Sequence, residues 1–213
     1  VFSGTEGLWE LTVKGQPGTL ISGLSMIWHH FLVLSGSGGG GKSTVAVNLA
    51  VALAMEGWRT GLLDVDFHGP SVPTLLHLTG GLFKSAEGGG ILPLESEYGI
   101  KVVSLGFALG RSDKAVIWRG PMKMKIIQQF LGDVEWGDLD WLVIDSPPGT
   151  GDEPLSIAQL IPATGAIIVT TPQEVSVMDS RKAVIFALKL NLKILGIIEN
   201  MSGLTCPHCG GKI

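Results

Sequence analysis

The chain has 213 residues, 45% of them hydrophobic, which fits one α/β domain with a large buried core and excludes a disordered protein. Its 15 Lys and Arg residues are outnumbered by 19 Asp and Glu residues, and no basic run is present to follow a nucleic-acid backbone or an anionic membrane. Every apolar stretch is interrupted well before the roughly 20 residues that span a bilayer. We therefore expect no nucleic-acid or membrane partner, and the composition favours a soluble cytoplasmic protein.

The first residues differ from the rest of the chain. WELTVK, residues 9–14, alternates apolar and polar side chains like a half-exposed strand, and GQPG, residues 15–18, indicates a turn. We assign residues 1–27 to an N-terminal segment of unknown role. We assign residues 28–213 to one main domain that ends just after a pair of cysteines.

Strand-like and helix-like segments alternate along the main domain. Strands are predicted at residues 31–35, 60–66, 101–107, 141–145, 165–171 and 194–200, and helices at residues 42–56, 121–131 and 174–190. This order is typical of an α/β fold with a doubly wound, mainly parallel sheet between two helical layers (three-layer αβα). Such sheets bind ligands beyond the carboxyl ends of their strands, so we expect the functional residues on the loops there.

SGSGGGGKST, residues 35–44, lies between the first predicted strand and the first predicted helix. Residues 36–43 match G-x-x-x-x-G-K-[ST], the phosphate-binding loop (P-loop). Glycine N–H groups surround the phosphates in such a loop, while Lys42 supplies a positive charge and Ser43 a hydroxyl for Mg²⁺. The pattern therefore predicts a nucleoside-triphosphate site, and a ligand-free glycine turn is the alternative.

Three aspartates follow predicted strands. Asp64 and Asp66 lie in LLDVDFHGPS, and Asp145 lies in WLVIDSPPGTGDEP. In P-loop enzymes one carboxylate serves Mg²⁺, and another orients or deprotonates the attacking water. A single aspartate at a strand end is more often a helix or turn cap. Three of them together with the P-loop favour a triphosphate site.

The two cysteines of the chain, Cys206 and Cys209, lie in CPHCG. A CxxC pair is found in zinc and iron–sulfur sites, which need about four ligands. Either His208 and a distant group complete the site, or a second copy of the protein does; two subunits sharing four thiolates is the more economical arrangement. A redox dithiol and a pair of unreactive cysteines are the alternatives.

From about residue 31 to residue 210, the chain resembles the Mrp/ApbC group of P-loop ATPases. These are ATP-dependent iron–sulfur cluster carriers within the wider class of MinD, ParA and the nitrogenase iron protein. The resemblance rests on the P-loop and on GLLDVDFHGPSVP, VIWRGPM, LDWLVIDSPPGTGDEPL, IIVTTPQEVSVMD and IIENMSGLTCPHCG. The elements RGP, PPGTGD and ENMS followed by CPHCG resemble the cluster carriers alone.

This resemblance implies a homodimer that binds ATP and Mg²⁺ in each subunit. A 4Fe-4S cluster would bridge the two pairs of Cys206 and Cys209 and would pass to apo-proteins, with slow ATP hydrolysis as the switch. The implied catalytic residues are Lys42 and Asp66. The implied Mg²⁺ residues are Ser43, Asp64 and Asp145. The implied nucleotide contacts are Gly36, Ser37, Gly38, Gly39, Gly40, Gly41, Lys42, Ser43 and Thr44 for the phosphates and Asn200 for adenine.

Two residues of the P-loop depart from the family pattern. Ser37 stands where the family has a lysine that reaches the γ-phosphate of the dimer partner, and Gly40 stands where it has a valine. We therefore expect weak ATPase activity. Residues 1–27 also do not match the family, and the family chain runs on past the cysteines into another helix and strand.

Two other functions remain as alternatives. A positioning ATPase like MinD or ParA would attach to a membrane or DNA, but the CxxC pair and the lack of a basic stripe disfavour it. A nucleotide-binding module with a structural zinc at the CxxC pair is the second alternative.

Overall fold

The computed structural model describes residues 24, 27–66, 69, 71–78, 90–105, 127–128 and 131–211. The expected N-terminal segment lies almost entirely outside the described residues. The last two residues of the strand expected at 101–107 also lie outside the described residues. The same holds for most of the helix expected at 121–131, of which residues 127, 128 and 131 are described and are helical. The boundary proposed between residues 27 and 28 stays a prediction.

The described residues form a seven-stranded sheet with the order β3-β4-β2-β5-β1-β6-β7. Its strands are β1 (Ile27–Ser35), β2 (Thr60–Asp64), β3 (Leu94–Glu95), β4 (Lys101–Ser104), β5 (Leu139–Asp145), β6 (Gly165–Thr170) and β7 (Ile194–Glu199). Neighbouring strands are parallel except for β3, which runs antiparallel to β4 at one edge.

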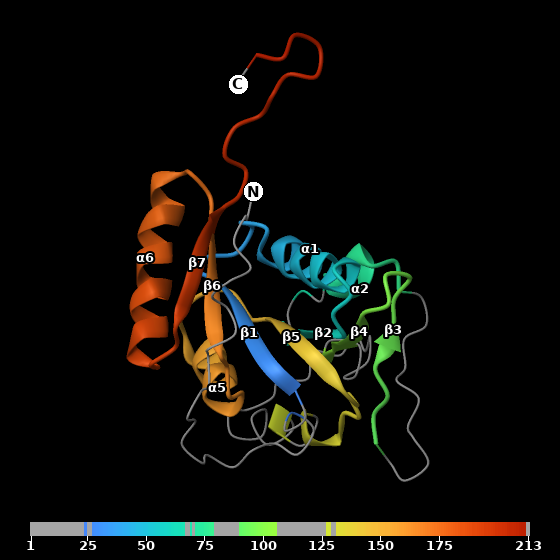
Figure 1. The fold of residues 1–213 in the computed structure, drawn as a ribbon. Helices are drawn as coiled ribbons and strands as arrows, with labels where there is room; N and C mark the ends of the chain where they lie inside the picture. Colours follow the sequence, from blue (N-terminus) through green and yellow to red (C-terminus); the bar gives the residue numbers. More distant parts are fainter. Residues whose placement is uncertain are drawn as a thin grey trace, which may run out of the picture.

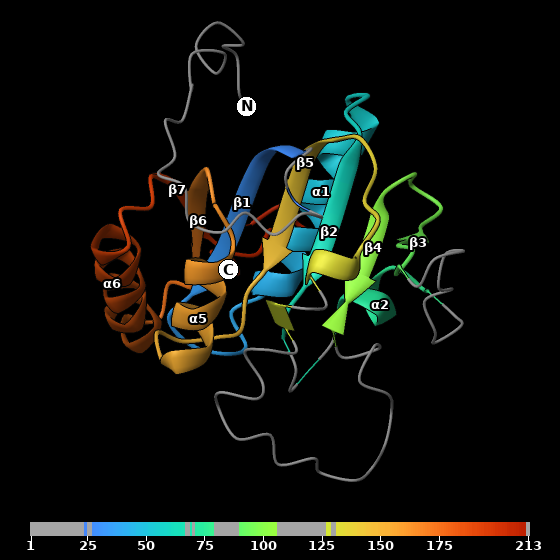
Figure 2. The same ribbon diagram turned by 90° about the horizontal axis from the view of Figure 1, so that it is seen from below.

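Helices cover both faces of this sheet (Figures 1 and 2). The helices are α1 (Lys42–Met55), α2 (Val72–Leu75), α5 (Asp152–Leu160) and α6 (Glu174–Lys189). On one face, Val33 of β1 belongs to the same buried cluster as Ala46 and Ala50 of α1. On the other face, Leu32 of β1 belongs to a cluster with residues of α5 and α6. Because the central strands are buried on both sides, their sequences are almost continuously apolar.

The predicted fold is confirmed, with small shifts at the ends of the elements. Helices α1 and α6 each end one residue before the predicted position, at Met55 and Lys189. β1 begins four residues before its prediction, because His29 and His30 interrupt the apolar run while their backbone still pairs with β5. Helix α5 was not predicted, since it has only nine residues and includes Pro154 in its first turn. No helix in the described part of the chain has the length and apolar character needed to cross a membrane.

The order of the strands places the P-loop at the centre of the sheet. β1 lies between β5 and β6, and the helices that follow β1 and β5 pack on opposite faces. Connections that leave two adjacent strands toward opposite faces open a crevice beyond the carboxyl ends of those strands. Residues 36–41 follow β1 at this crevice.

Candidate nucleotide and metal sites

The P-loop turns sharply from β1 into α1. Gly39 and Gly41 have positive φ angles of 82° and 84°, a backbone conformation that glycine adopts without steric cost. Gly41 caps α1, and the first turn of α1 contains no acidic side chain. The free N–H groups and the positive end of the helix dipole therefore point toward the loop, an arrangement that binds phosphate.

Lys42 begins α1 and makes an ion pair with the last residue of β5. Its Nζ lies 2.5 Å from Oδ1 of Asp145, and the two side chains are only 7% and 1% exposed. Lys42 Nζ also donates to Ser43 Oγ at 3.4 Å. The other oxygen of Asp145, Oδ2, is buried without a hydrogen-bond partner among the described residues. Residues 42, 43 and 145, predicted from distant motifs, thus lie together.

Asp64 lies beside Asp145, because β2 and β5 pair with these two residues in register. Ser104 Oγ donates to Asp64 Oδ2 at 3.0 Å, and the backbone N–H of Asp66 donates to Oδ1 at 3.0 Å. Burial and then the charge of Asp145 raise the pKa of Asp64 to about 7. Burial likewise raises the pKa of Asp145, against the opposing effect of Lys42. Asp64 is therefore a largely desolvated carboxyl that is partly protonated at neutral pH.

Asp66, one of the two implied catalytic residues, lies beyond the end of β2 and is half-buried. Its Oδ1 accepts a hydrogen bond from the backbone N–H of Gly69 at 3.3 Å. Its negative charge contributes to raising the pKa of Asp145, so its carboxylate acts on the same site. The predicted catalytic role of Asp66 stays a prediction.

Asn200 joins the P-loop from the far end of the chain. Directly after β7, its backbone N–H donates to Thr170 O at 2.8 Å, and its side-chain Nδ2 donates to Gly40 O at 3.0 Å. A Cβ atom on Gly41 would collide with the Asn200 amide, so the two segments are in close contact. The structure places Asn200 against the P-loop, and its predicted contact with adenine stays a prediction.

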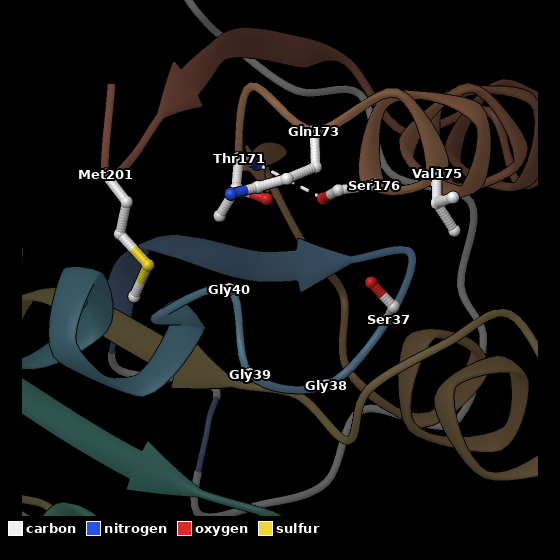
Figure 3. A pocket seen from close by; sticks show the side chains of 9 residues that line it. All are labelled: Ser37, Gly38, Gly39, Gly40, Thr171, Gln173, Val175, Ser176 and Met201. Atoms are coloured by element: carbon white, nitrogen blue, oxygen red, sulfur yellow. Dashed lines mark hydrogen bonds between the residues drawn. The ribbon is translucent and has the colours of Figure 1, made fainter. Parts of the chain in front are cut away.

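A pocket of about 320 Å³ opens beside the P-loop (Figure 3). It is lined by Ser37, Gly38, Gly39, Gly40, Thr171, Gln173, Val175, Ser176 and Met201. The side chain of Met201 points toward the loop in Figure 3, and the hydroxyl of Ser176 accepts a hydrogen bond from the N–H of Thr171 at 3.2 Å. The five lining residues after residue 170 were not predicted as site residues. The sequence did contain one signal for them, because TTPQ, residues 170–173, lies at the carboxyl end of a predicted strand, where such sheets bind ligands.

These residues fit a phosphate chain with Mg²⁺. A Cβ atom on Gly38 or Gly39 would meet nothing within 4 Å, so the outer side of the loop is open to a ligand. The partnerless Asp145 Oδ2 is an oxygen of the kind that Mg²⁺ or its waters bind. Ser43 lies at the start of α1, where its hydroxyl adjoins both Lys42 and Asp145.

The cysteines form a separate site on the segment that follows β7. Residues 201–205 are exposed, and Figure 1 shows this segment leaving the body of the fold. Cys206 begins a closed turn, in which its N–H donates to Gly211 O at 2.8 Å and its carbonyl accepts from Gly210 N at 2.9 Å. Hydrogen bonds from the N–H groups of Cys209 and His208 lower the pKa of the Cys206 thiol, with a further contribution from the Cys209 side chain.

The two thiols of this turn suit a metal, but the turn offers only part of a coordination sphere. Amide donors that stabilise a thiolate favour metal binding, because the thiolate is the form that binds. Among the described residues, no three His, Cys, Asp or Glu side chains group together as metal ligands. His208 thus has no acidic or thiol group from elsewhere in that part of the chain to complete a site with it.

Comparison with known proteins shows the family of this chain. Residues 26–213 match the ParA family model described as "NUBPL iron-transfer P-loop NTPase". An iron–sulfur cluster carrier protein of Saccharolobus solfataricus is 55% identical over 179 residues, which are 84% of this chain and 60% of that protein. The cytosolic Fe-S cluster assembly factor NUBP2 of Rattus norvegicus is 46% identical over 203 residues, 93% of this chain and 73% of that protein.

A solved structure has the same fold. A nucleotide-binding protein from Archaeoglobus fulgidus, in complex with ADP and with cobalt, superposes with a TM-score of 0.78 at 42% identity. The match covers 90% of this chain and 74% of that one. The chain thus spans about 60–74% of the length of these relatives.

Proposed function

The chain belongs to the ParA/NUBPL family of iron-transfer P-loop NTPases, and from this membership we propose that it is an ATP-dependent carrier of iron–sulfur clusters. It binds MgATP at the P-loop and a 4Fe-4S cluster at the cysteine pairs of a homodimer. It passes the cluster to apo-proteins in the cytoplasm. Names of relatives, which include cluster carriers and cytosolic assembly factors, support this function.

One observation carries the proposal: a single short segment connects the two sites. Asn200 donates a hydrogen bond to Gly40 of the P-loop, and the metal-binding turn begins six residues later at Cys206. A change in the P-loop that moves Asn200 therefore acts on the segment that leads to the cysteines. This connection gives ATP a physical route to the cluster.

The proposed nucleotide site binds ATP and Mg²⁺ through charged side chains and backbone N–H donors. The N–H groups of the P-loop and the ammonium of Lys42 hold the phosphates. Ser43 and Asp145 hold Mg²⁺, which neutralises charge on the phosphate oxygens when it is bound. Asp66 orients the attacking water, and Asn200 contacts the base.

The cluster end requires two copies of the chain. One copy supplies Cys206 and Cys209, and four thiolates complete the usual ligand set of a 4Fe-4S cluster. A symmetric homodimer brings the two pairs together across its axis. The same four thiolates also suit a structural zinc ion, so the experiment must distinguish the two metals.

Anaerobic reconstitution with iron and sulfide tests this function. We expect visible absorption, and iron and sulfide in equal amounts at about four of each per dimer. Zinc binding without colour, or a full cluster in a strictly monomeric sample with no added thiol, would contradict the proposal.

We predict that Cys206→Ser removes cluster loading and leaves ATP binding unchanged, because the cysteine turn and the P-loop share no ligand. Iron content and visible absorption report the first effect, and calorimetric titration with MgATP reports the second. Ser202→Ala is a matched control, since this exposed hydroxyl of the same segment donates to Glu199 O at 3.3 Å and is not among the proposed cluster ligands. It should load a cluster like the unmodified chain.

A further inference from the structure

Lys42 and Asp145, which the proposed nucleotide site needs for two different ligands, form an ion pair with each other. In that site Lys42 serves the phosphates and Asp145 serves Mg²⁺. In the structure the ammonium of Lys42 lies 2.5 Å from Asp145 Oδ1, with both side chains almost fully buried. Lys42 cannot take the phosphates without leaving this ion pair, and Asp145 offers Mg²⁺ only a carboxylate that the lysine already neutralises.

Removing one partner from a buried ion pair is strongly unfavourable, because it leaves an uncompensated charge out of contact with water. ATP alone withdraws Lys42 and leaves the Asp145 carboxylate without its cation. Mg²⁺ alone meets a carboxylate that Lys42 already neutralises. When both bind, the phosphates take the lysine and Mg²⁺ replaces it at Asp145, so every charge keeps a partner.

Asp145, rather than its neighbour Asp64, is built for this exchange. Both oxygens of Asp64 already accept hydrogen bonds, from Ser104 and from the backbone of Asp66. Asp145 binds Lys42 with Oδ1, and its buried Oδ2 has no partner in the described part of the chain. Mg²⁺ can therefore reach one oxygen of Asp145 while the lysine leaves the other.

We propose that Asp145 is a positioning residue that withholds Lys42 from nucleotide until Mg²⁺ takes the place of the lysine. The ion pair makes the site select MgATP against metal-free ATP. It also couples the two ligands reciprocally, because any factor by which Mg²⁺ tightens ATP is the factor by which ATP tightens Mg²⁺. The inference rests on the proposed nucleotide site and adds to it the basis of its metal requirement.

The test is a double-mutant cycle on ATP affinity, measured by calorimetry in EDTA and in excess Mg²⁺ at constant ionic strength. In the unmodified chain Mg²⁺ should tighten ATP strongly. Asp145→Asn frees Lys42, so metal-free ATP should bind about tenfold tighter than to the unmodified chain. The effect of Mg²⁺ on ATP affinity should shrink by a similar factor in this variant.

The same change in a Lys42→Ala background separates the ion pair from general electrostatics. Asp145→Asn should not tighten metal-free ATP there, because no lysine is released. Simple removal of a negative charge near the phosphates would tighten ATP equally in both backgrounds, and this outcome would overturn the proposal. Unchanged or weaker metal-free binding to Asp145→Asn would overturn it too.

A reciprocal measurement keeps the proposal testable if Asp145→Asn does not fold. Lys42→Met removes the competing ammonium while keeping most of the length of the side chain. Mn²⁺ titrated without nucleotide, with its free concentration followed by electron paramagnetic resonance, should bind this variant more tightly than the unmodified chain. Equal Mn²⁺ affinity would contradict the exchange. Failure of the unmodified chain to bind MgATP at all would instead overturn the nucleotide site itself.

Discussion

Asp64 links the stability of this protein to pH through one buried carboxyl. Its pKa is raised from 3.8 to about 7, first by burial and then by the charge of Asp145. A group whose pKa is higher in the folded state than in the unfolded state binds its proton more tightly when folded. Its contribution to stability is therefore complete below about pH 4, and it is lost as the pH rises through 7.

We predict that Asp64→Asn removes this pH dependence, because the amide stays neutral. From pH 5 to pH 8 the unmodified chain should lose stability relative to the variant, by on the order of a few kcal/mol. Urea unfolding at several pH values measures the difference. Asp138→Asn is a control, since the Asp138 side chain is 69% exposed and should follow the unmodified chain. A difference between the Asp64 variant and the unmodified chain that does not vary with pH would contradict the assignment.

At the scale of elements, the P-loop and α6 pack through backbone rather than side chains. A Cβ atom on Gly36 would collide with the backbone of Asp179 and Ser180 in α6. Backbone atoms within a helix cannot rotate aside as the end of a side chain can. The absence of a side chain at residue 36 thus lets α6 approach the start of the P-loop.

Gly36→Ala should therefore destabilise the fold by about 1–3 kcal/mol, the usual cost of overpacking a close contact. The neighbouring change Gly38→Ala is the matched control, because its Cβ would meet nothing within 4 Å. Urea unfolding of the two nucleotide-free variants compares them directly. Equal stability would show that α6 does not constrain residue 36.

For the whole molecule, the proposed homodimer bears on the rate of ATP hydrolysis. Ser37 lines the pocket beside the P-loop, and its side chain is short and uncharged. The family resemblance of the sequence implies a lysine at this position that reaches the γ-phosphate of the dimer partner. A cation delivered to the developing negative charge of phosphoryl transfer accelerates the reaction as an arginine finger does.

We predict that Ser37→Lys raises the single-turnover rate of MgATP hydrolysis by a factor on the order of 10² or more, with little change in ATP affinity. Rates are compared at saturating MgATP and at the same dimer concentration. Ser37→Met is the control for side-chain length without charge and should stay slow. If Ser37→Lys hydrolyses no faster than the unmodified chain, another cation such as Arg119 or Lys123 serves the site; both lie outside the described residues.

The sequence by itself determined the features that depend on neighbouring residues. Glycine spacing followed by lysine and serine specified the P-loop, and the helix-like segments at residues 42–56 and 174–190 matched α1 and α6 to within one residue. Apolar runs identified the central strands, because a strand buried on both faces tolerates few polar side chains. The first four residues of β1, which include His29 and His30, were missed, since backbone pairing with β5 holds them in the strand despite the polar side chains of the histidines.

Only the tertiary structure decided which distant groups meet and what charge they carry. Lys42 and Asp145 are 103 residues apart, and Asn200 and Gly40 are 160 apart, so their contacts follow from the strand order β2-β5-β1-β6-β7. The raised pKa of Asp64 likewise needs burial beside Asp145, which no local pattern encodes. Such contacts arise because parallel strands from separate parts of the chain bring their carboxyl ends to one edge of the sheet, where packing rather than sequence distance sets the neighbours.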